Sequence, residues 1–239
     1  MSEMTLAEHL DAASGDLTEE EATDARTYVE RLYKAGVTSL PQLVQTVSDV
    51  QTNPAVRDMA YSLLAWLRVR NASTVLTRAF EQEQNDSFIW AAANALVRAR
   101  AEDAVPTLLS VLERSSPTKE AAAAWTLGWL GGSHAVPVLR SVAMDSHRAV
   151  EVRAHATEAL GLLHAAEAVE DLIALLSVQS PELRYWAAYS LGQIADPASV
   201  PELERVAASD SGVLSNERSV RQEAIEALAA IHAKERDNS

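Results

Sequence analysis

One histidine and two carboxylates in the chain have a spacing that could hold a metal ion. Glu151, His155 and Glu158 are four and three residues apart, so one face of a helix would carry all three side chains. Imidazole nitrogen and carboxylate oxygen are ordinary zinc ligands. One histidine with two carboxylates on a solvated helix is, however, more typical of an exposed charged face. We therefore predict no metal site and no bound cofactor.

The chain offers few other groups for catalysis. It has no cysteine, which excludes a thiolate nucleophile and a zinc–cysteine site. It also has no glycine-rich phosphate loop, no G-x-S-x-G nucleophile motif and no clustered pair of acids. The sequence predicts no catalytic residues and favours a protein that acts by binding.

Tryptophan is the residue type that points to a binding surface. Only 5% of the residues are aromatic, yet five of them are tryptophans. Trp and Tyr dominate the energetics of protein interfaces, because a large ring fills a pocket and excludes water. Where these rings point depends on the elements that carry them.

Those elements form a repeating pair of helical patterns. The first member reads EDAVPTLLSVL at 102–112, SHAVPVLRSVA at 133–143 and AEAVEDLIALL at 166–176, and each is followed by a second pattern such as VRAHATEALGLL. A fixed period of this kind is the signature of a stacked repeat protein. The first helices are expected to begin, at intervals of 31–33 residues, near Leu40, Ala72, Val105, Val136, Val169 and Val200.

The second helices align on a leucine that has an alanine four residues before it. The aligned leucines are Leu64, Leu96, Leu127, Leu160, Leu191 and Leu228, and the alanines are Ala60, Ala92, Ala123, Ala156, Ala187 and Ala224. A small residue at a recurrent position lets neighbouring helices approach closely. Gly128, Gly161 and Gly192 directly follow the leucine and indicate the same close approach between repeats.

The predicted fold is all-α: a right-handed α-solenoid of about six helix pairs with an N-terminal helical cap. The cap covers residues 1–37, with helices at about 6–13 and 18–35, and Thr18 with Glu21 forms a capping box. Ala25, Tyr28, Val29, Leu32 and Tyr33 are the expected apolar face of its longer helix. The repeats are 38–70, 71–101, 102–132, 133–165, 166–196 and 197–233, and 234–239 is expected to be a frayed tail.

Two of the repeats contain extra residues between their helices. They lie in DSHRAVEVR at 145–153 and in ASDSGVLSNERSVR at 208–221. Longer loops in a solenoid project from one rim and are either tolerated insertions or functional segments. Both interpretations remain open from the sequence.

The helix-pair pattern AVPxLxxxL, then VRxxAxxALGxL, resembles a HEAT repeat, and more narrowly the HEAT-like repeats named after phycobilisome (bilin) lyases. The clearest matches are Ala135–Leu139 with Val152–Leu163, and Ala168–Leu172 with Leu183–Ile194. The resemblance covers roughly residues 38–233 and implies that the second helices line a concave side. The arginine usual in the family after the valine is matched at Arg57, Arg153, Arg184 and Arg221, whereas Ile89 and Glu120 depart from it. We expect these arginines to pair with acids at the turns.

The helical period then predicts which side chains face the concave solvent. They are the residues six before, two before and two after each aligned leucine, and they include four of the five tryptophans. Trp186 and His155 flank this face, and Trp125 and Trp129 are the expected anchors. The alternative is that the rings only fill gaps between helices. The candidate partner-binding residues are Asp58, Trp66, Trp90, Asn94, Arg98, Trp125, Trp129, Glu158, Tyr185, Tyr189 and Gln193.

The favoured function is a non-catalytic scaffold or adaptor that binds a partner helix or peptide, and basic residues in that partner would suit the acidic chain. The resemblance leaves two alternatives. A bilin-lyase-like protein would clasp a planar small molecule with its aromatic residues, and a HEAT-fold DNA glycosylase would need a basic groove. A HEAT-repeat di-iron hydroxylase would be expected to carry His-Glu dipeptides, and none of the six histidines is followed by Glu.

The composition narrows the class of partner and the location. The formal net charge is −14, which opposes a nucleic-acid partner. Arginine (17) greatly outnumbers lysine (3), so a halophilic source and an ordinary acidic protein are both open interpretations. No apolar run approaches the roughly 18 residues of a membrane span, and the N-terminus lacks the features of a signal peptide. We therefore expect a cytoplasmic protein with no membrane partner.

Overall fold

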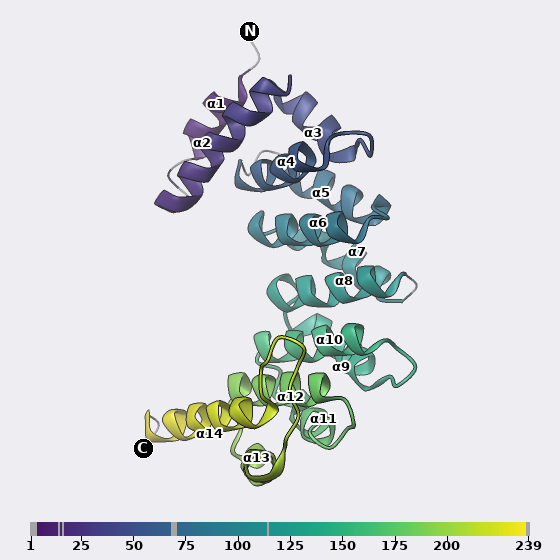
Figure 1. Cartoon of the computed structure of the whole chain (residues 1–239), viewed down its shortest axis with the longest axis vertical. Helices are drawn as coiled ribbons and strands as arrows, with labels where there is room; N and C mark the ends of the chain where they lie inside the picture. Colours follow the sequence, from purple (N-terminus) through teal and green to yellow (C-terminus); the bar gives the residue numbers. More distant parts are fainter. Residues whose placement is uncertain (1–3, 14, 16, 68–70, 114, 238–239) are drawn as a thin grey trace. The chain divides into compact units, whose positions relative to one another are not determined.

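The computed structural model describes residues 4–13, 15, 17–67, 71–113 and 115–237. Within these residues the secondary structure is helical and contains no β-strand; the two β-bridges, Thr5 with Ser39 and Val213 with Ser219, are isolated (Figure 1). The all-α class expected from the sequence is confirmed. The chain divides into two compact units, Met1–Thr107 (unit 1) and Leu108–Ser239 (unit 2).

Unit 1 contains the N-terminal cap and the first two helix pairs. Its α-helices are α1 (Leu6–Ala13), α2 (Glu19–Lys34), α3 (Leu40–Ser48), α4 (Pro54–Trp66), α5 (Ala72–Gln82) and α6 (Asp86–Arg98). The first helices of both pairs begin at the expected residues. An asparagine caps the N-terminus of both α4 and α6. The side chains of Asn53 and Asn85 accept hydrogen bonds from backbone N–H groups of the first turn.

The cap helix α2 begins as the sequence predicts. The Glu21 N–H donates to Thr18 Oγ1 at 3.2 Å and the Thr18 N–H donates to Glu21 Oε2 at 2.9 Å, which completes the capping box. Ala25 and Leu32 are fully buried, and α2 packs against α4. Tyr33 was expected on the same buried face but is 66% exposed. It lies roughly 80° around the helix from Ala25, at the edge of the apolar stripe.

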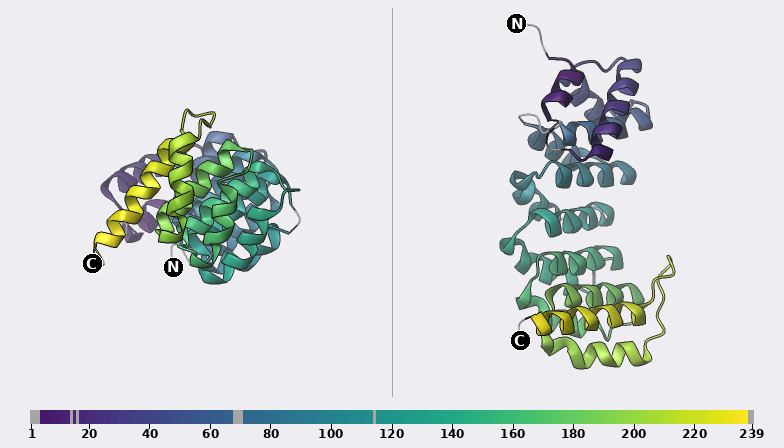
Figure 2. Two further views of the ribbon diagram at one scale, coloured as in Figure 1. Left: turned by 90° about the horizontal axis from the view of Figure 1, so that it is seen from below. Right: turned by 90° about the vertical axis from the view of Figure 1, so that its left-hand side faces the viewer.

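Unit 2 contains the remaining second helices, α8 (Pro117–Leu130), α10 (Val150–Leu162), α12 (Pro181–Ile194) and α14 (Val220–Asp237), with α9 (Val136–Met144), α11 (Val169–Leu175) and α13 (Val200–Ser209) as first helices. Helix α7 (Val105–Val111) spans the boundary between the units. In the right-hand view of Figure 2 the second helices lie side by side as successive layers. The first helices begin at the expected valines.

The last helix is longer than the sequence indicated. α14 continues to Asp237, so residues 234–237, expected to belong to a frayed tail, are helical. The Lys234 Nζ donates to the Ile194 carbonyl at 2.9 Å, which ties the end of α14 to the end of α12. Asn238 and Ser239, the rest of the expected tail, lie outside the described residues.

Small residues bring the second helices of unit 2 into close contact. All six recurrent alanines of the chain are fully buried. A Cβ added to Gly161 would lie 2.7 Å from Ser190 Cα, and one added to Gly128 or Gly192 would lie 2.9 Å from the Cα of an alanine on the next second helix. The close approach predicted for these glycines is confirmed.

Two of the recurrent arginines, Arg57 and Arg153, bind carbonyl groups at the C-terminal ends of the first helices. Arg57 Nε donates to the Val47 carbonyl, and Arg153 Nε to the Ala143 carbonyl, both at 2.9 Å. The expected pairing with acids is present for Arg57 with Glu83 (2.5 Å) and for Arg184 with Asp210 (2.6 Å). The described hydrogen bonds of the Arg153 and Arg221 side chains go to carbonyl oxygens instead.

The longer loop of the fourth repeat supplies the arginine that the third repeat lacks. Glu120 stands where the family has arginine, and Arg148 Nη1 reaches it at 2.8 Å while also donating to the Leu112 carbonyl at 2.7 Å. The extra residues at 145–153 therefore carry a structural contact between consecutive repeats.

Replacing Gly161 by alanine tests how tightly the second helices pack. Although alanine has the higher helix propensity by about 1 kcal/mol, we expect Gly161→Ala to destabilise the protein by about 1–3 kcal/mol, because its methyl group overlaps Ser190. The free energy of unfolding in urea measures this change. Gly15→Ala is the control, since no heavy atom lies within 4 Å of its added Cβ, and a similar small effect of both substitutions would contradict the close contact.

Candidate functional site

The structure exposes the predicted binding residues to very different degrees. Trp129 is 54% exposed, whereas Trp66 and Tyr185 are only 5% and 8% exposed. The remaining rings, Trp90, Trp125 and Tyr189, are half-buried, as is Glu158, and the exposed polar members are Asp58, Asn94, Arg98 and Gln193. Nine of the eleven candidate side chains are thus at least partly exposed, and the rings of Trp66 and Tyr185 are covered.

Trp66 in unit 1 is covered by the cap. Its ring stacks on that of Tyr28 from α2, with centroids 5.4 Å apart and planes 20° apart. The Arg98 guanidinium lies 5.4 Å from the Trp66 ring centroid. The prediction that Trp66 faces solvent is therefore wrong, because α2 packs on α4 and places Tyr28 over its end. Among the described residues, Trp66 Nε1 has no hydrogen-bond partner.

Three of the other unit 1 candidates meet around a small polar hollow. Asp58, Asn94 and Arg98 line a cavity of about 210 Å³ between α4 and α6. Asn94 Nδ2 donates to the Trp90 carbonyl at 2.9 Å, so its amide is oriented by its own helix. Arg98 also borders a second hollow of about 360 Å³, beside acidic residues of α2. This site is polar and mixed in charge.

The anchor pair expected on α8 is present in unit 2. The rings of Trp125 and Trp129 meet edge to face, with centroids 6.2 Å apart and planes 62° apart. This arrangement suits the ring quadrupoles. Trp129 is the largest exposed apolar side chain on the second helices of unit 2, and Trp125 supports it from one turn earlier.

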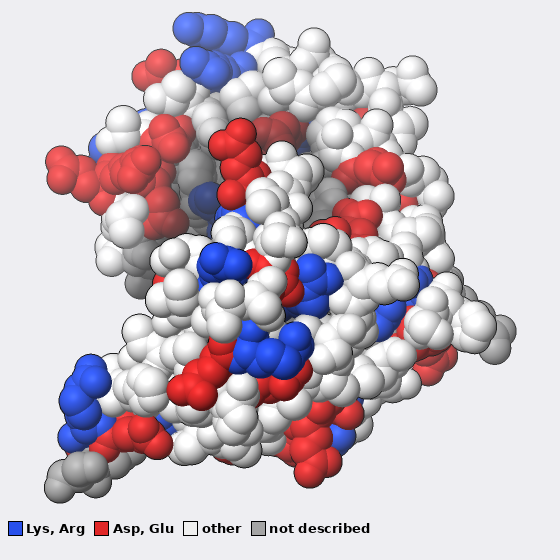
Figure 3. Space-filling model, turned by 60° about the horizontal axis from the view of Figure 1, so that its bottom comes forward, with Lys and Arg blue, Asp and Glu red and all other residues white. Residues whose placement is uncertain are grey.

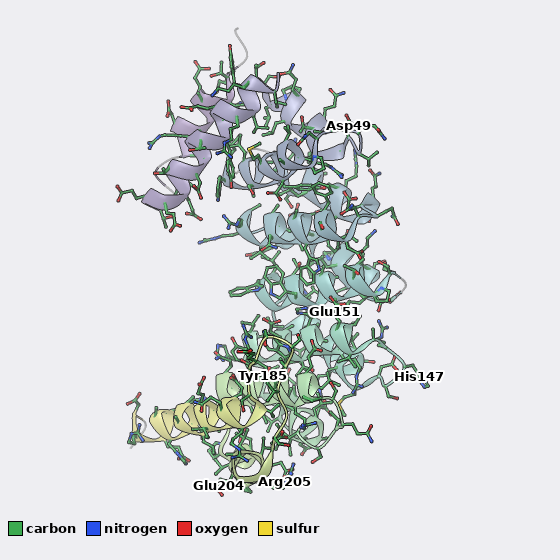
Figure 4. All side chains as sticks on the ribbon, viewed as in Figure 1. Asp49, His147, Glu151, Tyr185, Glu204 and Arg205 are labelled. Carbon is green, nitrogen blue, oxygen red and sulfur yellow. The ribbon has the colours of Figure 1, made fainter. Side chains whose placement is uncertain are left out.

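A second aromatic group lies on α12. The ring of Trp186 meets those of Tyr185 and Tyr189 edge to face, with centroids 5.3 and 5.5 Å apart. We call Tyr185, Trp186 and Tyr189 the α12 cluster. Burial, with the Glu223 carboxylate beside it, raises the pKa of Tyr185 to about 12. Figure 4 labels Tyr185, which lies beneath the segment that joins α13 to α14.

That segment, residues 210–219, forms a small hairpin. Asp210 anchors its base by accepting hydrogen bonds from Arg184 at 2.6 and 3.0 Å and from the Gly212 N–H at 2.7 Å. The Leu214 N–H donates to the Arg218 carbonyl at 2.8 Å. Figure 1 and the right-hand view of Figure 2 show the hairpin rising from the last helix pair beside α12.

Arg218 of the hairpin covers part of the α12 cluster. Its guanidinium carbon lies 5.6 Å from the Tyr185 ring centroid and 5.9 Å from that of Trp186. The exposure predicted for Tyr185 is therefore wrong, because the inserted residues of the sixth repeat fold back over it. Sequence reasoning missed Arg218, although the extra length of this loop was the signal that could have drawn attention to it.

Two carboxylates lie beside the α12 cluster, Glu223 next to Tyr185 and both Glu158 and Glu223 near Tyr189. Helices α10, α12 and α14 carry further glutamates that are at least partly exposed: Glu151, Glu182 and Glu226. On the face that Figure 3 shows, Lys and Arg side chains lie next to Asp and Glu side chains in small groups. Uncharged surface separates these groups from one another. His155 Nδ1 lies 3.0 Å from Glu158 Oε2. In the described parts of the chain no three His, Asp or Glu side chains are grouped to hold a metal ion.

The base of the hairpin should give unit 2 an acid-sensitive contact. Hydrogen bonds from Arg184 hold the pKa of Asp210 below its usual 3.8. A lowered pKa means that the contribution to stability is present above the unfolded-state value and is lost as the pH falls through the folded-state pKa. We therefore expect Asp210→Asn to lower the free energy of unfolding at neutral pH and to have little effect in acid. Chemical denaturation at pH values from neutral to below the folded-state pKa of Asp210 measures the difference in unfolding free energy between wild type and variant. A pH-independent difference would contradict the ion pair.

Sequence and structure comparisons place these features in a family. A model of HEAT repeats matches residues 75–150 and 143–229, which together are more than half of the chain. A chain of the CpcE–CpcF complex of phycocyanin lyase from Nostoc sp. PCC7120 has a similar structure, with a TM-score of 0.55 and 25% identity over 65% of this chain and 97% of that one. Among curated proteins, no sequence matches.

Two further solved structures resemble the chain. A designed armadillo repeat protein in complex with the peptide (KR)4 has a TM-score of 0.52 and 18% identity over 80% of this chain and 99% of its own, which shows the fold alone. Human deoxyhypusine hydroxylase has a TM-score of 0.44 and 22% identity over 80% of this chain and 84% of its own. None of the described helices has the length and apolar character to cross a membrane.

Proposed function

Because the chain belongs to the HEAT-repeat family, whose stacked helix pairs present extended binding surfaces, we propose that it is a non-catalytic module that binds a basic polypeptide segment. The contact surface is the solvent-facing side of the unit 2 second helices. The edge-to-face pairing of the exposed Trp129 with Trp125 is the observation that carries this proposal.

The exposure of Trp129 is the reason to favour recognition over packing. A tryptophan that only filled a gap between helices would be covered, as Trp66 is by Tyr28. Trp129 instead leaves half of its surface in water while its neighbour holds it in one orientation. A ring held in this way loses little side-chain entropy on binding, which is typical of an interface anchor.

The charges around the rings indicate the chemistry of the partner. Glu158 and Glu223 lie beside rings of the α12 cluster, and the whole chain carries a net charge of −14. Electrostatic complementarity favours a segment with Lys or Arg beside its apolar residues. The same charges disfavour a DNA-repair function, which needs a basic groove. We assign the primary contact to unit 2, and Asp58, Trp90, Asn94 and Arg98 to a separate polar site in unit 1.

Removing the exposed ring should weaken binding of a basic peptide. We expect Trp129→Ala to reduce affinity at least about tenfold, or about 1.4 kcal/mol, for a fluorescently labelled amphipathic peptide with leucine on one face and arginine on the other. Fluorescence anisotropy of the labelled peptide measures the affinity without using the protein's own tryptophans.

Two controls make that experiment specific. Met144→Ala removes a side chain that is 40% exposed on the first helix α9, and it should leave affinity unchanged. A peptide with glutamate in place of arginine should bind more weakly than the basic one. Equal affinity of both peptides, or equal binding by wild type and Trp129→Ala, would overturn the proposed surface.

The similarity to the phycocyanin lyase chain favours a second candidate function, the handling of a planar bilin. In this case the rings of α8 and the α12 cluster would clasp the chromophore. The absorbance spectrum of a linear tetrapyrrole should then shift when it is mixed with the protein, and less so with Trp129→Ala. An unchanged spectrum would remove this candidate. A cytoplasmic location stays an expectation from the sequence.

A further inference from the structure

The α12 cluster is built like a receptor for a flat cation. Trp186 stands edge to face with both tyrosines, at interplanar angles of 89° and 84°, so the three rings enclose an angular surface. The face of an aromatic ring attracts a cation through its quadrupole, and tryptophan does so most strongly. A guanidinium suits such a surface better than an ammonium, because it is planar and only weakly hydrated.

Acidic groups add to the attraction. Burial is the largest cause of the raised pKa of Tyr189, and the negative charges of Glu158 and Glu223 raise it further. Glu223 also lies beside the Tyr185 hydroxyl. Rings and carboxylates together therefore favour a positive charge at this position on unit 2.

A cation from the chain itself occupies this position. The Arg218 guanidinium contacts Tyr185 and Trp186, and among the described residues it takes part in no ion pair within 4 Å. Its described interactions with the rest of unit 2 are therefore the contacts with these two residues and the attraction of the nearby Glu223 carboxylate.

The hairpin that carries Arg218 is anchored at its base, whereas its tip makes little packing contact with the rest of unit 2. Asp210 holds the base to Arg184, but none of the residues 210–219 is buried, and Val213 is 57% exposed. A hollow of about 360 Å³ lies between the hairpin tip and α10 and α12, lined by His155, Pro181, Trp186, Val213 and Asn216 among others. Moving the tip therefore costs little buried apolar surface.

We propose that Tyr185, Trp186 and the nearby glutamates form a guanidinium subsite that Arg218 fills in the free protein, and that an arginine of the bound partner displaces it. The proposal rests on the proposed function, because it specifies the residue that the basic partner inserts. The hairpin then acts as a built-in competitor that discriminates against segments without arginine.

A small-molecule probe tests the subsite without any peptide. N-acetyl-arginine amide, titrated by isothermal titration calorimetry, should bind Arg218→Ala at least tenfold more tightly than the wild type. The uncharged, nearly isosteric N-acetyl-citrulline amide should show no such gain. Arg205→Ala is the matched control, because the Arg205 side chain is 49% exposed and pairs with Glu202 rather than with a ring.

Further variants guard against a change in folding. Arg218→Gln keeps most of the side-chain length and should behave like Arg218→Ala, while Trp186→Ala in the Arg218→Ala background should abolish the gain. Circular dichroism should show unchanged helix content in each variant. The subsite would be overturned if the arginine probe bound wild type and Arg218→Ala equally. It would also be overturned if the citrulline probe bound Arg218→Ala as tightly as the arginine probe does.

The basic peptide separates this inference from the function on which it rests. If the peptide binds through Trp129 but Arg218→Ala leaves both its affinity and the probe's unchanged, the subsite is wrong and the proposed function stands. If the arginine probe binds Arg218→Ala tightly while no basic peptide binds the wild type or this variant, the subsite stands and the proposed function fails.

Discussion

The close approach of consecutive second helices is the constraint on which the rest of unit 2 depends. At Gly161 the backbone of α10 comes so near Ser190 of α12 that no Cβ fits between them. Helices this close fix each other's rotation, because turning either one would drive a larger side chain into the contact. The small residues on the packed side of each second helix therefore determine which residues face solvent. The glycines and alanines of α8 and α12 thus fix the orientation of the rings on the opposite side of these helices.

Capping interactions hold the ends of these layers in register. Arginines on the second helices satisfy carbonyl groups at the ends of the first helices, which would otherwise lack partners. Where the sequence has Glu120 instead, Arg148 arrives from the next repeat and satisfies both the acid and the Leu112 carbonyl. The contact joins two repeats rather than the two helices of one, so a departure from the family pattern becomes a link between neighbours.

The sequence predicted the helices well because their information is local and periodic. All six first helices begin at the expected residues, and the six recurrent alanines are buried. The exposure of Trp66 and Tyr185 could not be predicted in the same way. Periodicity tells which side of a helix a residue occupies but not what covers that side, and here the covers come from segments outside the repeat pattern. The same limit explains why Arg218 was missed.

Tyr28 and Arg218, the side chains that cover Trp66 and Tyr185, differ in how firmly they are held. This difference has consequences for binding. Tyr28 covers Trp66 from a helix that buries Ala25 and Leu32 completely, and full burial of a leucine is worth about 1.5–3 kcal/mol. Arg218 covers Tyr185 from a hairpin without a single buried residue, and a cation–π contact at an exposed site is worth about 0.5–1 kcal/mol. The first cover is thus part of the core of unit 1. The second is weak enough for one well-placed guanidinium from another chain to replace it.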